Sequence, residues 1–247
     1  MEKPPIPLVI AHRGCSAHAP ENTLAAFRMA HEAGADGIEL DVMLSADDRL
    51  VVIHDATVDR TTNGNGRVDR MPYAALRELD AGAKFSEAFQ GERLPLLEQV
   101  YEALGGKFLI NVELKNYAHP FDQLTQKVVR LTQAHGLVDS VMFSSFNPLN
   151  LSRARRLEPR IRLGLLTFPG NAGRVLRGKV GLMFPQDALH PYFEDVTASM
   201  VEVAHKRGHQ VNPWTVDDPA ALKRLRELGV DMVICNDPAA ARLILEG

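Results

Sequence analysis

The chain has 247 residues, of which 45% are hydrophobic and 24% are charged, and its formal net charge is -3. These proportions are typical of a globular protein, and they exclude both intrinsic disorder and a membrane-spanning design. A net charge this small leaves no broad basic field, so we expect no nucleic-acid partner and no stable membrane association. Any affinity for phosphate must come from a local site.

The length matches the roughly 250 residues typical of an eight-stranded β/α barrel. Cys15 and Cys235 are the only cysteines, and neither has a metal-binding spacing, so a disulfide scaffold is excluded. Residues 1–7 contain three prolines and no apolar core of a signal peptide. No later stretch reaches transmembrane length. We therefore expect a cytoplasmic protein.

Apolar β-type runs alternate with helical patterns along the whole chain, which predicts parallel strands joined by crossover helices. We interpret residues 1–247 as one (β/α)8 TIM barrel domain. An open doubly wound sheet is the alternative, because it shows the same alternation and also places functional residues at the carboxyl ends of strands. The predicted strands are Leu8–His12, Gly37–Val42, Phe108–Leu114, Val141–Ser145, Ile161–Leu166, Val180–Phe184, His209–Pro213 and Asp231–Cys235.

Helical patterns lie between these runs, and the first of them has recognisable ends. Asn22 is suited to be its N-cap and Gly34 to be its C-terminal stop. The predicted helices are 22–33, 95–104, 121–134, 148–157, 194–206, 217–228 and 238–245.

One segment departs from this rhythm. Leu50–His54 resembles a further strand, but the loop after Val42 is too short for a crossover helix, so we expect an antiparallel hairpin. From about residue 56 to 91 the pattern is irregular and contains Asn-Gly turns at Asn63-Gly64 and Asn65-Gly66. We predict a small insertion after this hairpin, too small for a separate hydrophobic core, forming a wall or lid over the barrel mouth.

Two predicted strands carry carboxylates at alternate positions. Glu39 and Asp41 project from one face of the first, and Glu113 projects from one face of the second. Three carboxylates at one barrel mouth would repel one another unless a cation lay between them. Oxygen ligands without cysteine favour Mg²⁺ or Ca²⁺ as the cofactor. The alternative is a set of solvated strand faces, or internal pairing with Lys115.

His12 and His54 each end an apolar run and are followed at once by a polar partner, Arg13 or Asp55. Because histidine titrates near neutral pH, two imidazoles facing one substrate can serve as general base and general acid. We therefore predict His12 and His54 as the catalytic pair. The sequence does not indicate which of them is the acid.

Positive charge and an aromatic ring complete the predicted site. Arg13 and Lys115 are suited to phosphate oxygens, although either could instead pair with the neighbouring acids. Trp214 follows a predicted strand and could form an apolar wall for the substrate's carbon skeleton, with core packing as the alternative. We predict Arg13, Lys115 and Trp214 as substrate-binding residues.

Taken together, an ordered set of motifs along nearly the full chain resembles the glycerophosphodiester phosphodiesterase family. The set is far more specific than any one motif. Its members are His12-Arg13-Gly14, Pro20-Glu21-Asn22-Thr23, Glu39-Leu40-Asp41-Val42, His54-Asp55, Asp59-Arg60-Thr61-Thr62-Asn63-Gly64, Glu113-Leu114-Lys115, Phe143-Ser144-Ser145-Phe146, Trp214-Thr215-Val216 and Asp237-Pro238.

This resemblance implies a β/α barrel that cleaves small-molecule glycerophosphodiesters into an alcohol and sn-glycerol 3-phosphate. By motif position, His12 and His54 resemble the family's acid/base pair, and Arg13 and Lys115 its phosphate contacts. Its ligands for Mg²⁺ or Ca²⁺ are matched by Glu39, Asp41 and Glu113.

Other functions remain as alternatives. Lys115 could form a Schiff base in a barrel aldolase or isomerase. The chain could be a noncatalytic phosphate-binding module, or a lysophospholipase D that accepts acylated substrates. The absence of an obvious membrane-binding helix in the sequence favours water-soluble diesters. A homo-oligomer is also left open.

Overall fold

The structure is a computed structural model that describes residues 5–117, 119–178 and 180–247. Its sheet contains nine strands, eight of them parallel and one antiparallel. They are β1 (Leu8–His12), β2 (Gly37–Leu44), β3 (Leu50–Val52), β4 (Leu109–Leu114), β5 (Val141–Ser145), β6 (Arg162–Leu166), β7 (Ala188–His190), β8 (Gln210–Val211) and β9 (Met232–Cys235).

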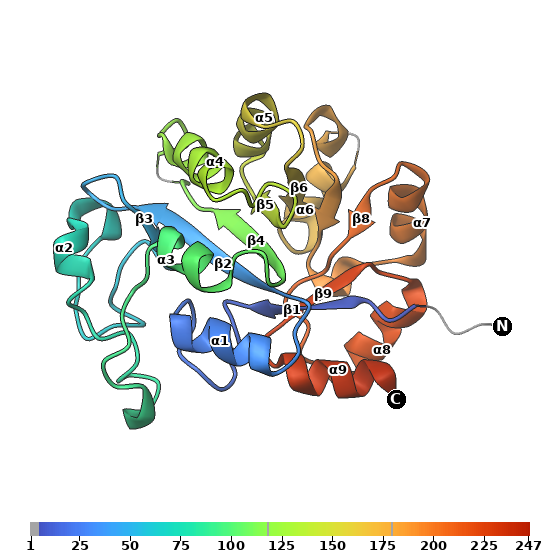
Figure 1. Cartoon of the computed structure of the whole chain (residues 1–247). Helices are drawn as coiled ribbons and strands as arrows, with labels where there is room; N and C mark the ends of the chain where they lie inside the picture. Colours follow the sequence, from blue (N-terminus) through green and yellow to red (C-terminus); the bar gives the residue numbers. More distant parts are fainter. Residues whose placement is uncertain (1–4, 118, 179) are drawn as a thin grey trace.

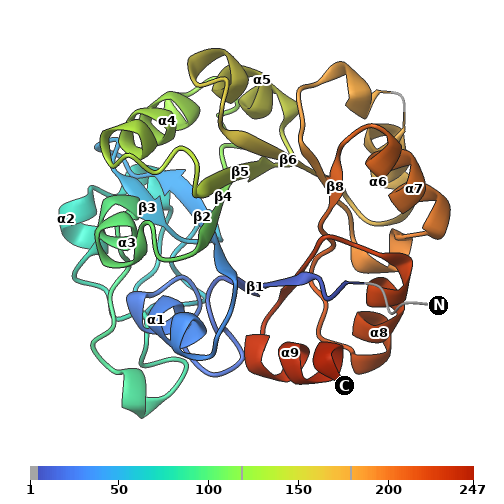
Figure 2. The same cartoon turned by 45° about the vertical axis from the view of Figure 1, so that its right-hand side comes forward.

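The parallel strands close into a barrel. Their hydrogen-bonded order is β8-β7-β6-β5-β4-β2-β1-β9. The two ends of this order are joined by backbone hydrogen bonds from Asp231 to Val211 and from Ile234 to Pro213, each 3.0 Å. In Figure 2 the strands surround the centre of the molecule and the helices lie outside them. The predicted TIM barrel is confirmed, and the open doubly wound alternative is wrong.

Most of the connecting helices begin where the sequence has a capping residue. Asp218 and Asp237 each accept a hydrogen bond from a backbone N–H of the first turn, and each is followed by a proline that is preorganised for the first helical position. The helices, drawn in Figure 1, are α1 (Leu24–Glu32), α2 (Tyr73–Leu76), α3 (Leu97–Leu104), α4 (Leu124–Ala134), α5 (Pro148–Leu157), α6 (Gly170–Arg177), α7 (Ala198–Lys206), α8 (Pro219–Leu228) and α9 (Pro238–Glu246).

One predicted strand is wrong. The apolar segment Val180–Phe184 contains a 3-10 turn over Gly181–Met183, and the seventh barrel strand is instead β7, Ala188–His190. Met183 is 79% exposed, so the apolar side chains of this segment do not form a buried strand. β7 is only three residues long and ends in histidine, which leaves no apolar run for a sequence pattern to detect. Helix α6, just before this turn, was also not predicted.

Asn22 is not the N-cap of α1. The cap is Thr23, whose side chain accepts a hydrogen bond from the backbone N–H of Ala26. Asn22 adopts a left-handed conformation with φ of 59°, which asparagine tolerates better than most residues. This conformation turns its side chain toward Asp41 instead of toward the helix.

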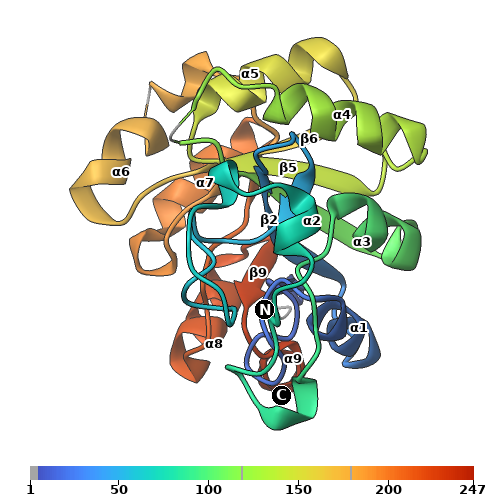
Figure 3. The ribbon, with the colours of Figure 1, turned by 90° about the vertical axis from the view of Figure 1, so that its left-hand side faces the viewer.

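The predicted hairpin is confirmed, because β3 pairs with β2 in the antiparallel sense. The insertion that follows it packs around a small apolar cluster, which includes Val58, Val68 and Leu76 but also Val51 and Ile53 of the hairpin region. The insertion therefore shares its apolar contacts with the barrel hairpin. Figure 3 looks onto the insertion, which lies in front of the barrel strands in this view.

Apolar side chains fill the part of the barrel interior that lies away from the carboxyl ends of the strands. Ile10, Met142, Ala188, Met232 and Ile234 form one buried cluster there, while alternate residues of the same strands pack outward against the helices. Above this cluster, toward the carboxyl ends of the strands, the inward positions become polar. The mouth of the barrel is therefore charged, and the interior beneath it is apolar.

Candidate active site

Three buried carboxylates meet at the mouth of the barrel. Glu39 and Asp41 lie on β2, and Asp41 pairs in register with Glu113 of neighbouring β4. One carboxylate oxygen from each of the three lies within 4.8 Å of the others, and all three residues are no more than 8% exposed. The alternation of the two strands and their register together produce this cluster.

Burial and mutual repulsion oppose full ionisation of these three carboxyl groups. Burial raises the pKa of Glu39 well above its ordinary value, and the charges of Asp41 and Glu113 raise it further. Burial likewise raises the pKa of Glu113. Burial opposes ionisation of Asp41 too, but the charges of Lys115 and Arg13 outweigh it and lower the pKa of Asp41 to about 2. The surroundings therefore do not favour full ionisation of all three carboxyl groups.

Lys115 and Arg13 supply the neighbouring positive charge. The Lys115 Nζ lies 3.4 Å from both Asp41 Oδ1 and Glu113 Oε1. Burial favours neutral Lys115, but Asp41 and Glu113 outweigh that effect and raise its pKa. The Arg13 Nε lies 3.4 Å from Asp41 Oδ2, and the Arg13 backbone N–H donates to Glu39. Both cations thus lie beside the carboxylates and remain charged.

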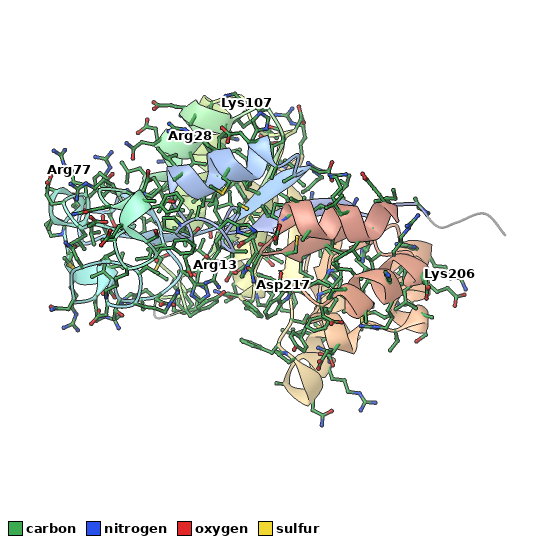
Figure 4. The ribbon with its side chains drawn as sticks, turned by 90° about the horizontal axis from the view of Figure 1, so that it is seen from below. Arg13, Arg28, Arg77, Lys107, Lys206 and Asp217 are labelled. Atoms are coloured by element: carbon green, nitrogen blue, oxygen red, sulfur yellow. The ribbon has the colours of Figure 1, made fainter. Side chains whose placement is uncertain are left out.

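His12 is partly buried at the end of β1. Its Nδ1 lies 2.8 Å from Asn236 Oδ1, and the Asn236 side-chain amide donates to Asp217. Figure 4 labels Arg13 and Asp217, which line one pocket together with His12. Burial, reinforced by the charge of Arg13, lowers the pKa of His12 to about 4. This imidazole is therefore neutral at neutral pH.

His54 follows β3 and has a different partner. Its Nδ1 lies 2.6 Å from the carboxylate oxygen Oδ1 of Asp55. Both imidazoles belong to segments paired with β2, since His12 pairs in register with Glu39 and the backbone N–H of Ile53, next to His54, donates to the carbonyl of Asp41. The two predicted catalytic histidines thus lie around the same carboxylates.

Trp214 belongs to a group of aromatic residues in the segments that follow β5, β6 and β8. Its ring makes an edge contact with Phe146, with centroids 5.5 Å apart, and Phe146 stacks on Phe168 at 4.5 Å. The Trp214 Nε1 donates to the backbone carbonyl of His190, which fixes the indole. Phe168 remains 50% exposed. The mouth therefore carries aromatic rings as well as charged groups.

Several residues at this site were not predicted to belong to it. Asn22 donates to Asp41, Tyr117 donates to Glu113, and Glu21 accepts from Arg13. Asn236 holds His12, and Arg60 of the insertion contacts Asp55. The motifs Pro20-Glu21-Asn22-Thr23 and Asp59-Arg60 were visible in the sequence, but nothing in their spacing indicates which groups they contact.

Comparison with known proteins identifies the family. Residues 12–240 match the family described as "Glycerophosphoryl diester phosphodiesterase family". This chain belongs to that family. A glycerophosphodiester phosphodiesterase of Caldanaerobacter subterraneus subsp. tengcongensis is 43% identical to it over 232 residues, with 94% of each chain covered.

Solved structures of this family share the fold. A phosphodiesterase of Oleispira antarctica, in complex with the product sn-glycerol-3-phosphate, has a TM-score of 0.87 at 31% identity, with 98% of both chains covered. A glycerophosphodiester phosphodiesterase from Agrobacterium tumefaciens has a TM-score of 0.80 at 30% identity, covering 98% of this chain and 100% of that one.

As a glycerophosphoryl diester phosphodiesterase, the protein is an enzyme of the phosphoric diester hydrolase class. The Schiff-base aldolase and the noncatalytic binding module are therefore wrong, and a charged Lys115 paired with two carboxylates is also a poor amine nucleophile. Among the described residues, every helix is too short or too polar to cross a bilayer.

Proposed function

We propose that the enzyme depends on one divalent cation, Mg²⁺ or Ca²⁺, held by Glu39, Asp41 and Glu113. The observation that carries this proposal is the convergence of three buried carboxylates. The donor set fits a hard cation, because it offers only oxygen and because Asp41 Oδ1 is buried without a hydrogen-bond partner. When bound, such a cation would neutralise the carboxylates and offset negative charge on the phosphate.

His12 is the general base in this proposal. Its Nδ1 is directed at an amide oxygen, so the proton resides on Nδ1 and the lone pair of Nε2 is available to accept a proton. Burial keeps the ring uncharged. His12 Nε2 therefore takes the proton of the attacking hydroxyl or water as the oxygen of that nucleophile bonds to phosphorus.

His54 is the general acid. The carboxylate of Asp55 at Nδ1 compensates positive charge on the ring, which suits the group that carries a proton into the reaction. His54 Nε2 donates this proton to the alcohol oxygen as its bond to phosphorus breaks. Water completes the overall hydrolysis to an alcohol and sn-glycerol 3-phosphate, whether it attacks directly or opens a cyclic phosphate.

Arg13 and Lys115 bind the phosphate oxygens, and Trp214 contacts the carbon skeleton. Acid/base catalysis contributes about 10² to 10⁴ in rate, so positioning and charge compensation by these groups must contribute much of the remainder. Arg13 and Lys115 lie beside the carboxylates and Trp214 packs against Phe146, which suits a substrate with a charged centre and an apolar backbone.

We propose water-soluble glycerophosphodiesters as substrates in the cytoplasm. The barrel mouth carries buried carboxylates and two cations, and the product complex of the Oleispira antarctica relative contains sn-glycerol-3-phosphate. A lysophospholipase D activity is the alternative, and the exposed ring of Phe168 at the mouth is the observation that favours it.

Glycerol 3-phosphate release from glycerophosphocholine and glycerophosphoethanolamine tests this proposal, with Mg²⁺, Ca²⁺ or chelator present. His12→Ala and His54→Ala should each lower turnover by about 10²- to 10⁴-fold while calorimetric cation binding persists. Glu113→Ala should weaken both. Full activity in chelator would contradict the metal role, and full activity in either histidine variant would contradict that residue's role.

A further inference from the structure

Arg60 extends from the insertion to two acidic residues of the barrel loops. Its Nε donates to Asp55 Oδ2 at 2.6 Å. Its two terminal nitrogens donate to the two carboxylate oxygens of Glu21, at 2.7 and 2.8 Å. The guanidinium is planar, so these three bonds fix the relative orientation of both carboxylates.

Each of these carboxylates also accepts a hydrogen bond from a residue of the active site. The other oxygen of Asp55 accepts from His54 Nδ1 at 2.6 Å. Glu21 Oε1 also accepts from Arg13 Nη1 at 2.8 Å. A continuous chain of charged hydrogen bonds therefore runs from His54 through Arg60 to Arg13, and Arg13 in turn lies beside Asp41.

We propose that Arg60 is a positioning residue, through which the insertion orients both His54 and Arg13. The inference rests on the proposed roles of those two residues. His54 follows a strand end and its side chain is 31% exposed, so packing alone leaves its ring some freedom. Asp55 restricts this freedom only if Asp55 is itself fixed, and the guanidinium of Arg60 provides that restraint.

The fold of the insertion depends on other residues. The Arg60 side chain is 49% exposed, whereas Thr62 is fully buried and its hydroxyl donates to the carbonyl of Val58 and accepts from Gly64. Exposed ion pairs contribute little to stability. Replacing Arg60 should therefore affect turnover far more than unfolding.

The experiment compares Arg60→Ala, Arg60→Lys and Arg77→Gln. Arg77 is the matched control, because it is an exposed arginine of the same insertion that pairs with its neighbour Glu78, and Figure 4 labels it far from Arg13. We expect Arg60→Ala to lower kcat at least tenfold with a small change in KM, cation affinity and melting temperature. Arg60→Lys, which lacks the planar guanidinium, should keep only part of the wild-type kcat. Arg77→Gln should match the wild type.

Two further measurements separate positioning from general damage. Millimolar methylguanidinium should raise kcat of Arg60→Ala but not of the wild type. In a background carrying both Glu21→Gln and Asp55→Asn, Arg60→Ala should cause little additional loss, because the same chain is already broken. Wild-type kcat in Arg60→Ala, absence of rescue, or fully additive losses would each overturn the inference.

His54→Ala in the same assay distinguishes this inference from the proposed function. If His54→Ala is fully active, the proposed function fails. If His54→Ala is inactive while Arg60→Ala keeps its full kcat, only the role of Arg60 fails.

Discussion

His12 and His54 are the same residue type in one site, but their hydrogen-bond partners differ. An amide oxygen of Asn236 faces His12, and a carboxylate of Asp55 faces His54. The amide oxygen accepts from Nδ1 of His12 and leaves its Nε2 free, whereas the partner of Nδ1 in His54 is a charged acceptor. Their different roles in the proposed mechanism therefore arise from these partners.

Asn236→Ala should lower kcat by roughly 2- to 10-fold, the equivalent of one lost neutral hydrogen bond of about 0.5–1.5 kcal/mol. Without the amide oxygen, the proton of His12 is no longer held on Nδ1. Kinetics and the ¹⁵N NMR shifts of His12 measure both effects. His18→Asn is the control, because His18 is an exposed histidine of the loop between β1 and α1. An unchanged tautomer in Asn236→Ala would contradict this account.

At the scale of elements, each β/α unit contributes a strand end that faces the mouth and a helix that covers the strand. Units with strong local signals, such as β2 and β4 or the Asp-Pro starts of α8 and α9, were predictable. The unit containing α6 and β7 was not, because β7 is short and its neighbouring apolar segment is exposed.

Asp218→Ala should destabilise the protein by about 1 kcal/mol, within a range of about 0.5–2, because it removes the N-cap of α8. The Asp218 carboxylate accepts from the backbone N–H of Ala221 at 2.7 Å. Thermal unfolding should show a decrease of about 2–4 °C in Tm with unchanged turnover. Asp218→Asn keeps an acceptor and should remain close to the wild type, so equal losses in both variants would argue against the cap.

At the scale of the whole molecule, closing the barrel buries polar side chains. His190 is 1% exposed, and its Nε2 accepts from Asn212 while its Nδ1 has no hydrogen-bond partner. Burial lowers the pKa of His190 to about 3. Below pH 6.5 the unfolded chain binds a proton here that the folded chain does not bind, so stability falls as pH falls from 6.5 toward 3.

Between pH 7 and pH 5 this histidine should cost about 2 kcal/mol of unfolding free energy, from about 1.5 pKa units at 1.36 kcal/mol each. His190→Gln cannot take up the proton, so its unfolding free energy should fall by about 2 kcal/mol less than that of the wild type over the same range. Urea unfolding at both pH values measures the difference. His31→Gln, at an exposed imidazole, is the control, and equal pH slopes in His190→Gln and the wild type would refute the role of His190.

Local regularities made much of this protein predictable from its sequence. Alternation along a strand places Glu39 with Asp41, and the ends of apolar runs mark His12 and His54. The barrel follows from the repeated β/α pattern and the chain length. These features depend on a few neighbouring residues, so they can be read without knowing the fold.

Only the tertiary structure decided which side chains hold these residues in place. Arg60 meets Glu21 across 39 positions, and His12 meets Asn236 across 224. Asn22 illustrates the difference, since its sequence context suggests a helix cap while the fold uses it to bind Asp41. Such pairings arise when the barrel closes and brings distant loops to one mouth, and no local pattern encodes them.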